Sequence, residues 1–335
     1  MQLIAMRDAM IATGLLLVAV YAGSARLEHF DPALSGYLAA VTVACFSVAY
    51  NVSGFWRRQP SALYGRTLLR ALGRPLALLA VMRAGASDLV SQSFIRRRSR
   101  VRWLAHMCLA WGTLVAFAIT VPLVCGWLHF EAERDGIYRV FVFSVPLLRF
   151  DVSGLLGWLI FHALSLAAVA VLLGGLGLGA MRLARRHEAR AVSSFHLGPI
   201  ALLLGVAATG LALPITGQME SQAWFRLAAL AHEVAVIALL VTLPYGKLLH
   251  LFIRPLHMGV QLLRAQSASR ARCAGCGDTL APDEQLAALE SVLLARGFRF
   301  AEHQRLCPGC RRRSLAARHS AILNGLFQPK PGAGR

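Results

Sequence analysis

The stretch GLLGWLIFHALSLAAVAVLLGGLGLGAM, residues 154–181, contains no aspartate, glutamate, lysine or arginine. A helix of about 20 apolar residues spans the hydrocarbon core of a bilayer, so this segment is long enough to cross a membrane. Hydrophobic residues make up 57% of the 335 residues and charged residues 15%. This composition excludes an ordinary soluble enzyme built around one core. Similar apolar runs predict six spans: residues 3–23, 37–56, 102–128, 154–181, 196–213 and 224–252.

The first of these segments carries Arg7 and Asp8 near its start, and a cleaved signal peptide is the alternative interpretation. We interpret it as a span because no clear small-residue cleavage site precedes the polar stretch 24–31. A chain in lipid must satisfy its backbone polar groups within each segment. The sequence therefore predicts an all-α membrane protein of about six transmembrane helices.

Positive charge is distributed unevenly along the chain. Its 35 lysine and arginine residues outnumber 16 acidic residues and give a formal net charge of +19. The cations gather after the predicted second, fourth and sixth spans, and such loops face the cytoplasm. We expect a multi-pass protein of a bacterial cytoplasmic (inner) membrane, with both termini cytoplasmic and with membrane lipid around its helices.

Domain boundaries follow from these shifts in composition. A short apolar segment at residues 71–82, between basic patches, predicts an interfacial helix rather than a seventh span. The predicted parts are two N-terminal spans (1–56), a basic cytoplasmic loop with the interfacial helix (57–101), a four-helix core (102–255), a small cytoplasmic zinc-ribbon-like domain with four cysteines (264–325) and a disordered tail (326–335).

Histidines are the notable polar residues of the predicted spans. Ionisable side chains inside a bilayer are costly and are candidates for function, although any single histidine could simply bond to a neighbouring helix. His232 and His250 are 18 residues apart, which places them on one face of a continuous helix and about 27 Å apart along it. Pro244 lies between them and predicts a kink. The histidines concerned are His106, His162, His196, His232 and His250.

Counting from the loops predicts two histidine pairs at two depths. His162 and His232 lie at a similar depth near the outer leaflet, and His106 and His250 lie level near the cytoplasmic side. Two such pairs are what a membrane protein with two haems requires. His196, at the start of its predicted span, is either an interfacial residue or a ligand. Three cations near the inner pair could bind haem propionates or anchor the chain at the membrane surface: Arg102, Lys247 and Arg254.

Two stretches carry a resemblance to a known family. RWLAHMCLAWG, residues 102–112, resembles the haem-ligating third helix of heterodisulfide-reductase-type membrane cytochromes b. LPYGKLLHLFIRP, residues 243–255, together with His232, is similar to the last helix of the gamma subunit of respiratory nitrate reductase and its relatives. The resemblance covers residues of about 100–260. It implies that residues 102–255 form a cytochrome b core.

The resemblance also implies two b haems, exchange of electrons with menaquinone or ubiquinone, and a soluble cytoplasmic partner with iron–sulfur clusters or a flavin. Carried over, His232 is the outer ligand and His250 the inner one. The nitrate reductase subunit has its other two ligands ten residues apart on one helix, but Ala116 and Val206 occupy the corresponding positions after His106 and His196. The outer partner is therefore assigned to His162 by depth, and a single haem is the alternative.

Acid–base groups near the predicted outer haem are candidates for handling the protons of quinol. Glu233 could belong to a proton path or hydrogen-bond a haem ligand. The candidates are His129, Asp151, Gln218, Glu220 and Glu233. The chain has no nicotinamide or flavin fingerprint and no phosphate-binding loop, so any final substrate would react on another subunit.

The C-terminal region holds two C-x-x-C motifs, CAGC at 273–276 and CPGC at 307–310. Two such turns supply four thiolates for a tetrahedral metal site, and the reducing cytoplasm disfavours disulfides. Zinc in a structural site is the first expectation. Iron in a rubredoxin-like site is the alternative, although the usual aromatic residues are missing. The expected ligands are Cys273, Cys276, Cys307 and Cys310.

The predicted function is electron transfer, with the cysteine-bearing tail docking the soluble partner. Arg311, Arg312 and Arg313 could indicate nucleic-acid binding, but the few interleaved aromatics disfavour it, so we expect no nucleic-acid partner. Two alternatives come from other classes. A transporter would need broken helices and a central site, of which the sequence offers little. A membrane-tethered zinc-ribbon adaptor would need none of the five histidines.

Overall fold

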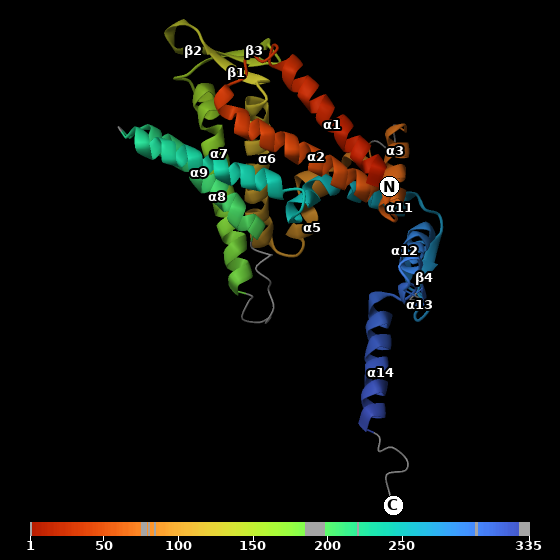
Figure 1. The fold of residues 1–335 in the computed structure, drawn as a ribbon. Helices are drawn as coiled ribbons and strands as arrows, with labels where there is room; N and C mark the ends of the chain where they lie inside the picture. The colour runs from red at the N-terminus through yellow and green to blue at the C-terminus, as the bar shows by residue number, and fades with distance from the viewer. Residues whose placement is uncertain are drawn as a thin grey trace, which may run out of the picture. The chain divides into compact units, whose positions relative to one another are not determined.

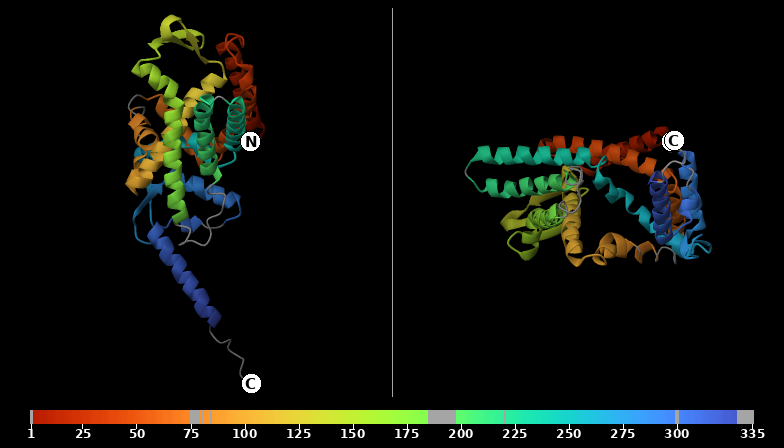
Figure 2. Two further views of the ribbon diagram at one scale, coloured as in Figure 1. Left: turned by 90° about the vertical axis from the view of Figure 1, so that its left-hand side faces the viewer. Right: turned by 90° about the horizontal axis from the view of Figure 1, so that it is seen from below.

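The computed structural model describes residues 2–74, 79, 81–83, 85–184, 198–219, 221–298 and 301–327. The chain divides into two compact units, one formed by residues 1–54 and 86–254 and the other by residues 55–85 and 255–335 (Figures 1 and 2). The boundary at residues 85 and 86 falls inside the predicted basic loop. The first part of that loop therefore belongs with the cysteine-bearing region and the second part with the apolar helices.

The first unit contains the long apolar helices. Six helices of the described residues are long and apolar enough to cross a membrane, which supports a multi-pass membrane protein. Large apolar side chains such as Leu166 and Leu173 are exposed on these helices, as lipid contact requires. The helices are α1 (Gln2–Gly23), α2 (Ser35–Arg57), α6 (Arg100–Val124), α7 (Leu155–Ala184), α8 (Gly198–Gly217) and α9 (Gln222–Thr242).

Helices α6 and α7 pack against each other (Figure 1), and each contributes a glycine to the contact. A Cβ atom on Gly112 of α6 would lie 2.7 Å from the carbonyl oxygen of Ala167, and one on Gly174 of α7 would lie 2.5 Å from that of Ala105. Small residues of this kind allow membrane helices to pack backbone against backbone. Little space is left between α6 and α7 at these two levels.

Buried apolar side chains connect the remaining helices of this unit. One cluster contains Val171 of α7, Leu203 and Ala207 of α8, and Leu239 of α9. A second cluster joins Ala40 and Ala44 of α2 to Leu240 of α9. Helix α9 therefore packs against α8 on one side and against α2 on another.

The sixth span is shorter than expected. Helix α9 ends at Thr242 and is followed by a turn that contains Pro244, the short helix η6 (Lys247–Leu249) and α10 (His250–Ile253). Proline has no N–H group to continue the helical hydrogen bonds and its ring collides with the preceding turn. The prediction of one continuous helix to residue 252, with His232 and His250 on the same face, is therefore wrong.

In the sequence, a three-stranded antiparallel sheet lies between α6 and α7. The prediction of an all-α protein is therefore also wrong in part. The strands are β1 (Leu128–Ala132), β2 (Ile137–Val142) and β3 (Val145–Asp151), in the order β1-β2-β3. Helix α6 ends at Val124, before the predicted end at residue 128. Glu133, beside the sheet, forms ion pairs with Arg139 and Arg149 of neighbouring strands.

A short connection precedes α6 in the first unit. It contains the π-helical turn η2 (Ala86–Val90) and α5 (Ser93–Arg96). The indole nitrogen of Trp103 donates to the carbonyl of Ser91 at 2.7 Å, and that of Trp111 to the carbonyl of Val90 at 3.3 Å. Two indoles of α6 therefore hold this connection.

The second unit is built on two packed helices, α3 (Ser61–Leu72) and α11 (Leu256–Gln266). Gly259 of α11 packs directly on the backbone of Tyr64, where any Cβ atom would collide. The rest of the unit comprises β4 (Arg270–Arg272), β5 (Thr279–Pro282), α12 (Asp283–Ala295), α13 (Ala301–Gln304) and α14 (Pro308–Phe327).

Two predictions concern segments that the structure describes only in part. The interfacial helix was expected at residues 71–82, but α3 ends at Leu72, and residues 75–78 and 80 lie outside the described part of the chain. The tail was expected to be disordered from residue 326, but α14 continues to Phe327. Residues 328–335 lie outside the described residues.

Candidate functional site

The inner pair of predicted ligands lies close enough for their charges to interact, despite the break after α9. His106 is on α6 and His250 begins α10, and the charges of His250, Arg254 and Arg182 all act on His106. The Arg254 guanidinium also lies over the ring of Phe94, 4.4 Å from its centroid. Arg182, at the end of α7, was not among the predicted site residues. Its position 76 residues from His106 in the chain gave no local signal.

The two inner rings differ in their hydrogen bonds. The Nδ1 atom of His250 contacts the carbonyl oxygen of Lys247. This bond directs Nε2 away from the backbone, as in metal-ligating histidines. The Nδ1 atom of His106 is buried and has no hydrogen-bond partner in the described residues. A buried imidazole nitrogen in this state is costly unless the site holds another group.

The outer predicted ligand His232 faces α8. Its Nδ1 atom lies 3.0 Å from the Oγ1 atom of Thr209, and that hydroxyl donates its proton to the carbonyl of Gly205 at 2.8 Å. The hydroxyl oxygen therefore accepts the Nδ1–H of His232. Gly210 borders the same ring, since a Cβ atom there would lie 3.2 Å from Cε1. Thr209 was not predicted, because nothing in the sequence distinguishes it from other threonines of the spans.

His162 lies on α7 and is exposed. Its Nδ1 atom lies 2.8 Å from the carbonyl oxygen of Trp158, and the two rings are stacked with centroids 4.6 Å apart. This arrangement also directs Nε2 away from the backbone. No contact between His162 and His232 occurs among the described residues, so their pairing stays a prediction.

The other predicted cofactor residues occupy varied positions. Arg102 is half-buried in the first turn of α6, where its N–H donates to Ser99 Oγ, and Lys247 is exposed at the start of η6. His196 and Glu220 lie outside the described residues.

Glu233 points away from its neighbour His232. Its carboxylate lies against Gly36 of α2, and its charge acts on Tyr37. His232 instead contacts α8. The described contacts therefore give no support to a hydrogen bond between Glu233 and the His232 ring, and they leave Glu233 at the boundary of α2 and α9.

His129 lies on β1 between two other rings. The imidazole of His29 stacks on it at 3.9 Å and the ring of Phe141 at 4.9 Å. Both ring nitrogens are buried without a hydrogen-bond partner among the described residues. Burial and His29 lower the pKa of His129, and Glu131 opposes this shift. A base enclosed in this way is poorly placed to meet quinol.

Asp151 and Gln218 are weaker candidates for proton transfer with quinol than Glu233. The carboxylate of Asp151 accepts hydrogen bonds at 2.8 Å from the N–H and hydroxyl of Ser153, which lower the pKa of Asp151. It stabilises the turn between β3 and α7. Gln218 is exposed just after the end of α8.

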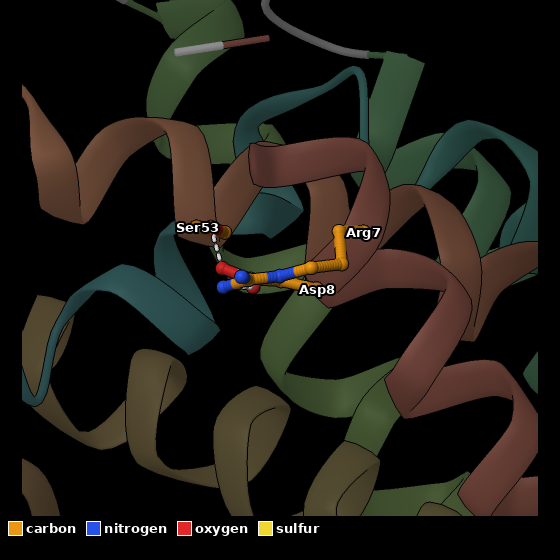
Figure 3. Close-up of polar contacts among 3 residues, drawn as sticks. All are labelled: Arg7, Asp8 and Ser53. Atoms are coloured by element: carbon orange, nitrogen blue, oxygen red, sulfur yellow. Dashed lines mark hydrogen bonds and ion pairs between the residues drawn. The ribbon is translucent and has the colours of Figure 1, made fainter. Parts of the chain in front are cut away.

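A carboxylate of α1 links the first two helices (Figure 3). Ser53 of α2 donates its hydroxyl to Asp8 of α1 at 2.6 Å, and the Arg7 guanidinium lies 3.1 Å from the other carboxylate oxygen. The indole of Trp127 also donates to the carbonyl of Ala19 at 2.9 Å. Side-chain hydrogen bonds thus tie α1 to the rest of the unit at two levels.

The four cysteines of the C-terminal motifs, which we term the four-cysteine cluster, come together as the spacing predicted. The sulfur atoms of Cys273, Cys276, Cys307 and Cys310 all lie within 4.8 Å of one another, close enough to hold one metal ion. The first motif follows β4, and the second leads into α14. Gly275 packs on the cluster, since a Cβ atom there would lie 3.0 Å from the sulfur of Cys310.

Backbone N–H groups stabilise thiolates in the four-cysteine cluster. The sulfur of Cys273 accepts from the N–H of Cys307 at 3.1 Å and from that of Gly275 at 3.4 Å. The Cys307 bond is the main cause that lowers the pKa of Cys273 to about 6. The N–H of Cys310 donates to the sulfur of Cys307 and lowers its pKa as well. Thiolate is the form that binds a metal.

No family model, curated protein or solved structure matches the chain. Its function is therefore argued from its own residues.

Proposed function

We propose that the chain is a membrane cytochrome b subunit, which transfers electrons between membrane quinone and a soluble cytoplasmic iron–sulfur or flavin partner. One observation carries the proposal. His162, His232 and His250 each use Nδ1 to contact a protein oxygen, which makes Nε2 the nitrogen available to a ligand. Histidines that ligate metals are oriented in this way by an oxygen on the other nitrogen.

The inner site has the strongest set of residues. His106 and His250 would be the axial ligands, and they lie close enough for their charges to interact. Arg182 and Arg254 supply positive charge beside the pair, and Arg102 and Lys247 stand near the same membrane surface. Guanidinium groups bind carboxylates such as haem propionates through charge-assisted hydrogen bonds.

The outer site would use His232, with His162 as its partner. Thr209 fixes the ring of His232 through Nδ1, and Gly210 gives the ring space beside α8. A single haem held by the inner pair is the alternative if His162 does not reach the outer site. Haem, when bound, supplies one-electron oxidation and reduction between the two sides of the membrane.

Glu233 is the best candidate to receive a proton when quinol is oxidised. Its carboxylate is near the middle of α9, where it lies against Gly36 and close to Tyr37. A carboxylate at this depth can accept a proton from a quinol hydroxyl and release it toward the outer surface. The quinone would be menaquinone or ubiquinone.

The four-cysteine cluster completes the proposal on the cytoplasmic side. Four thiolates favour zinc in a structural role, and iron is the alternative. Both motifs, CAGC and CPGC, lack the aromatic residues that usually accompany a rubredoxin-like iron site, so we favour zinc. We assign this region to docking of the soluble redox partner.

A quinol-reduction experiment tests the function. The purified full-length protein is mixed anaerobically with a reduced short-chain quinol while its visible spectrum is recorded. We expect the visible α-band of reduced b haem to grow on the addition of quinol. A protein that contains haem but is not reduced by quinol would contradict the quinone assignment. A folded protein without haem would favour a transporter or a tethered adaptor.

A further inference from the structure

Arginine side chains follow the second cysteine motif at the start of α14. Cys310 and Arg313 are three residues apart on this helix, so both side chains lie on the same face. The Arg313 guanidinium donates to the sulfur of Cys310 at 3.3 Å. The charges of Cys276 and Cys307 also act on the same guanidinium. Arg313 is thus in contact with one sulfur and close to two others.

Among the described residues, the side chains of the two preceding arginines do not donate to a cysteine sulfur; they donate to other groups nearby. Arg311 donates to the carbonyl of His303 at 3.1 Å and to the side-chain oxygen of Gln304 at 3.3 Å. Arg312 donates to the carbonyl of Pro308 at 3.4 Å. Among these three neighbours, only Arg313 has a described side-chain hydrogen bond to a sulfur of the four-cysteine cluster. The run of three arginines therefore contains residues with different roles, which the sequence did not distinguish.

We infer that Arg313 is a positioning residue of the four-cysteine cluster, which orients the sulfur of Cys310 toward the bound metal and offsets part of the negative charge around that metal. This inference rests on the proposed metal binding. Four thiolates around one divalent ion leave an excess of two negative charges, which one guanidinium halves. A charge-assisted hydrogen bond also makes the sulfur a poorer target for electrophiles, which would displace it from the metal.

The four ligands differ in exposure, and this difference predicts an order of reaction. Cys276 is exposed, whereas Cys273 and Cys310 are buried. With Arg313 in place, we expect an alkylating reagent to modify Cys276 before Cys273 and Cys310. Without it, Cys310 loses its charged donor and should react earlier.

The test compares zinc loss from matched variants of the full-length protein. Wild type, Arg313→Gln, Arg313→Lys and Arg312→Gln are purified with zinc and incubated with excess EDTA, and the zinc retained per chain is measured over time by mass spectrometry. We expect Arg313→Gln to lose zinc about tenfold faster than wild type, as the loss of a hydrogen bond to a charged group implies. Arg312→Gln should match wild type. Arg313→Lys should be intermediate, since it keeps the charge but not the planar donor geometry.

A second readout separates positioning from a general effect on folding. The same proteins are treated with N-ethylmaleimide, and modification of each cysteine is followed by peptide mass spectrometry. Earlier modification of Cys310 in Arg313→Gln, with the helical content unchanged by circular dichroism, supports the inference. Equal zinc loss in Arg313→Gln and Arg312→Gln would overturn the inference and leave metal binding intact. A wild-type protein that binds neither zinc nor iron would overturn both the inference about Arg313 and the proposed metal binding.

Discussion

The Nδ1 atom of His232 lies 3.0 Å from the Oγ1 atom of Thr209, so a hydroxyl of α8 orients the histidine of α9. The same hydroxyl is held by the carbonyl of Gly205, which fixes its direction. Helix α8 therefore contributes to the outer candidate site without a ligand of its own among its described residues.

Replacing Thr209 by valine should weaken the outer haem site. The substitution removes a hydrogen-bond partner of Nδ1, and loss of such a partner lowers metal-site affinity by about 10- to 100-fold. We expect less haem per chain after purification and a shifted midpoint potential of the remaining outer haem. Thr216→Val is the matched control, because that hydroxyl donates to carbonyls of its own helix. Equal haem content in the two variants would argue against the role of Thr209.

Glu233→Gln should slow electron entry from quinol and leave the haem spectrum unchanged. General acid–base groups contribute about 100-fold or more to rates, and glutamine cannot take the proton. The rate is measured by stopped-flow reduction with quinol, after reduction by dithionite has confirmed equal haem content. Glu28→Gln, an exposed residue of the connection between α1 and α2, is the control. A Glu233→Gln rate within about twofold of the control would show that another group receives the proton.

Ser53→Ala should destabilise the contact between α1 and α2. The hydroxyl donates to Asp8 at 2.6 Å, and interhelical hydrogen bonds in membranes are worth about 1 kcal/mol. We expect a lower midpoint temperature of unfolding in detergent, measured by scanning fluorimetry. Thr42→Val serves for comparison, because its hydroxyl bonds to Leu38 within α2. No difference between the two variants would mean that Asp8 satisfies its charge through its other contacts.

Acid should destabilise the β-sheet region through His129. Burial and His29 lower the pKa of His129 below 6.5 in the folded protein. The unfolded chain therefore binds more protons just below pH 6.5, so the free energy of unfolding falls as the pH drops through this window and is unaffected well above it. The measurement compares unfolding temperatures at about pH 7.5 and about pH 5.5, on either side of this window. We expect a smaller decrease in His129→Gln than in wild type, and an equal decrease would exclude His129 as the cause.

Much of the helical framework was predictable from sequence, because a bilayer demands about 20 apolar residues in each span. All six predicted spans have a counterpart among the described apolar helices. Their ends were less predictable. Helix α9 stops before Pro244, although apolar residues continue beyond it, because hydropathy does not register a missing N–H group. The strands between α6 and α7 were not predicted, because each is only five to seven residues long.

Long-range packing explains the rest of what the sequence did not reveal. The four-cysteine cluster was predictable because two local turns supply its ligands at a recognisable spacing. The contact of α3 and α11 at Tyr64 and Gly259 was not predictable, since the two positions are 195 residues apart in the chain. Similarly, the proximity of Arg182 to His106 depends on how α6 and α7 pack.

The central claim is that intramembrane histidines bind haem, and the haem content of the purified protein tests it most directly. The measurement is the pyridine haemochrome spectrum of the full-length protein, expressed per chain by amino-acid analysis. We predict about two b haems per chain, falling to about one in His232→Ala and in His250→Ala. His319→Ala, on the exposed α14, should keep the wild-type value. A correctly folded wild-type protein without haem, or His232→Ala and His250→Ala variants with undiminished haem, would contradict the account.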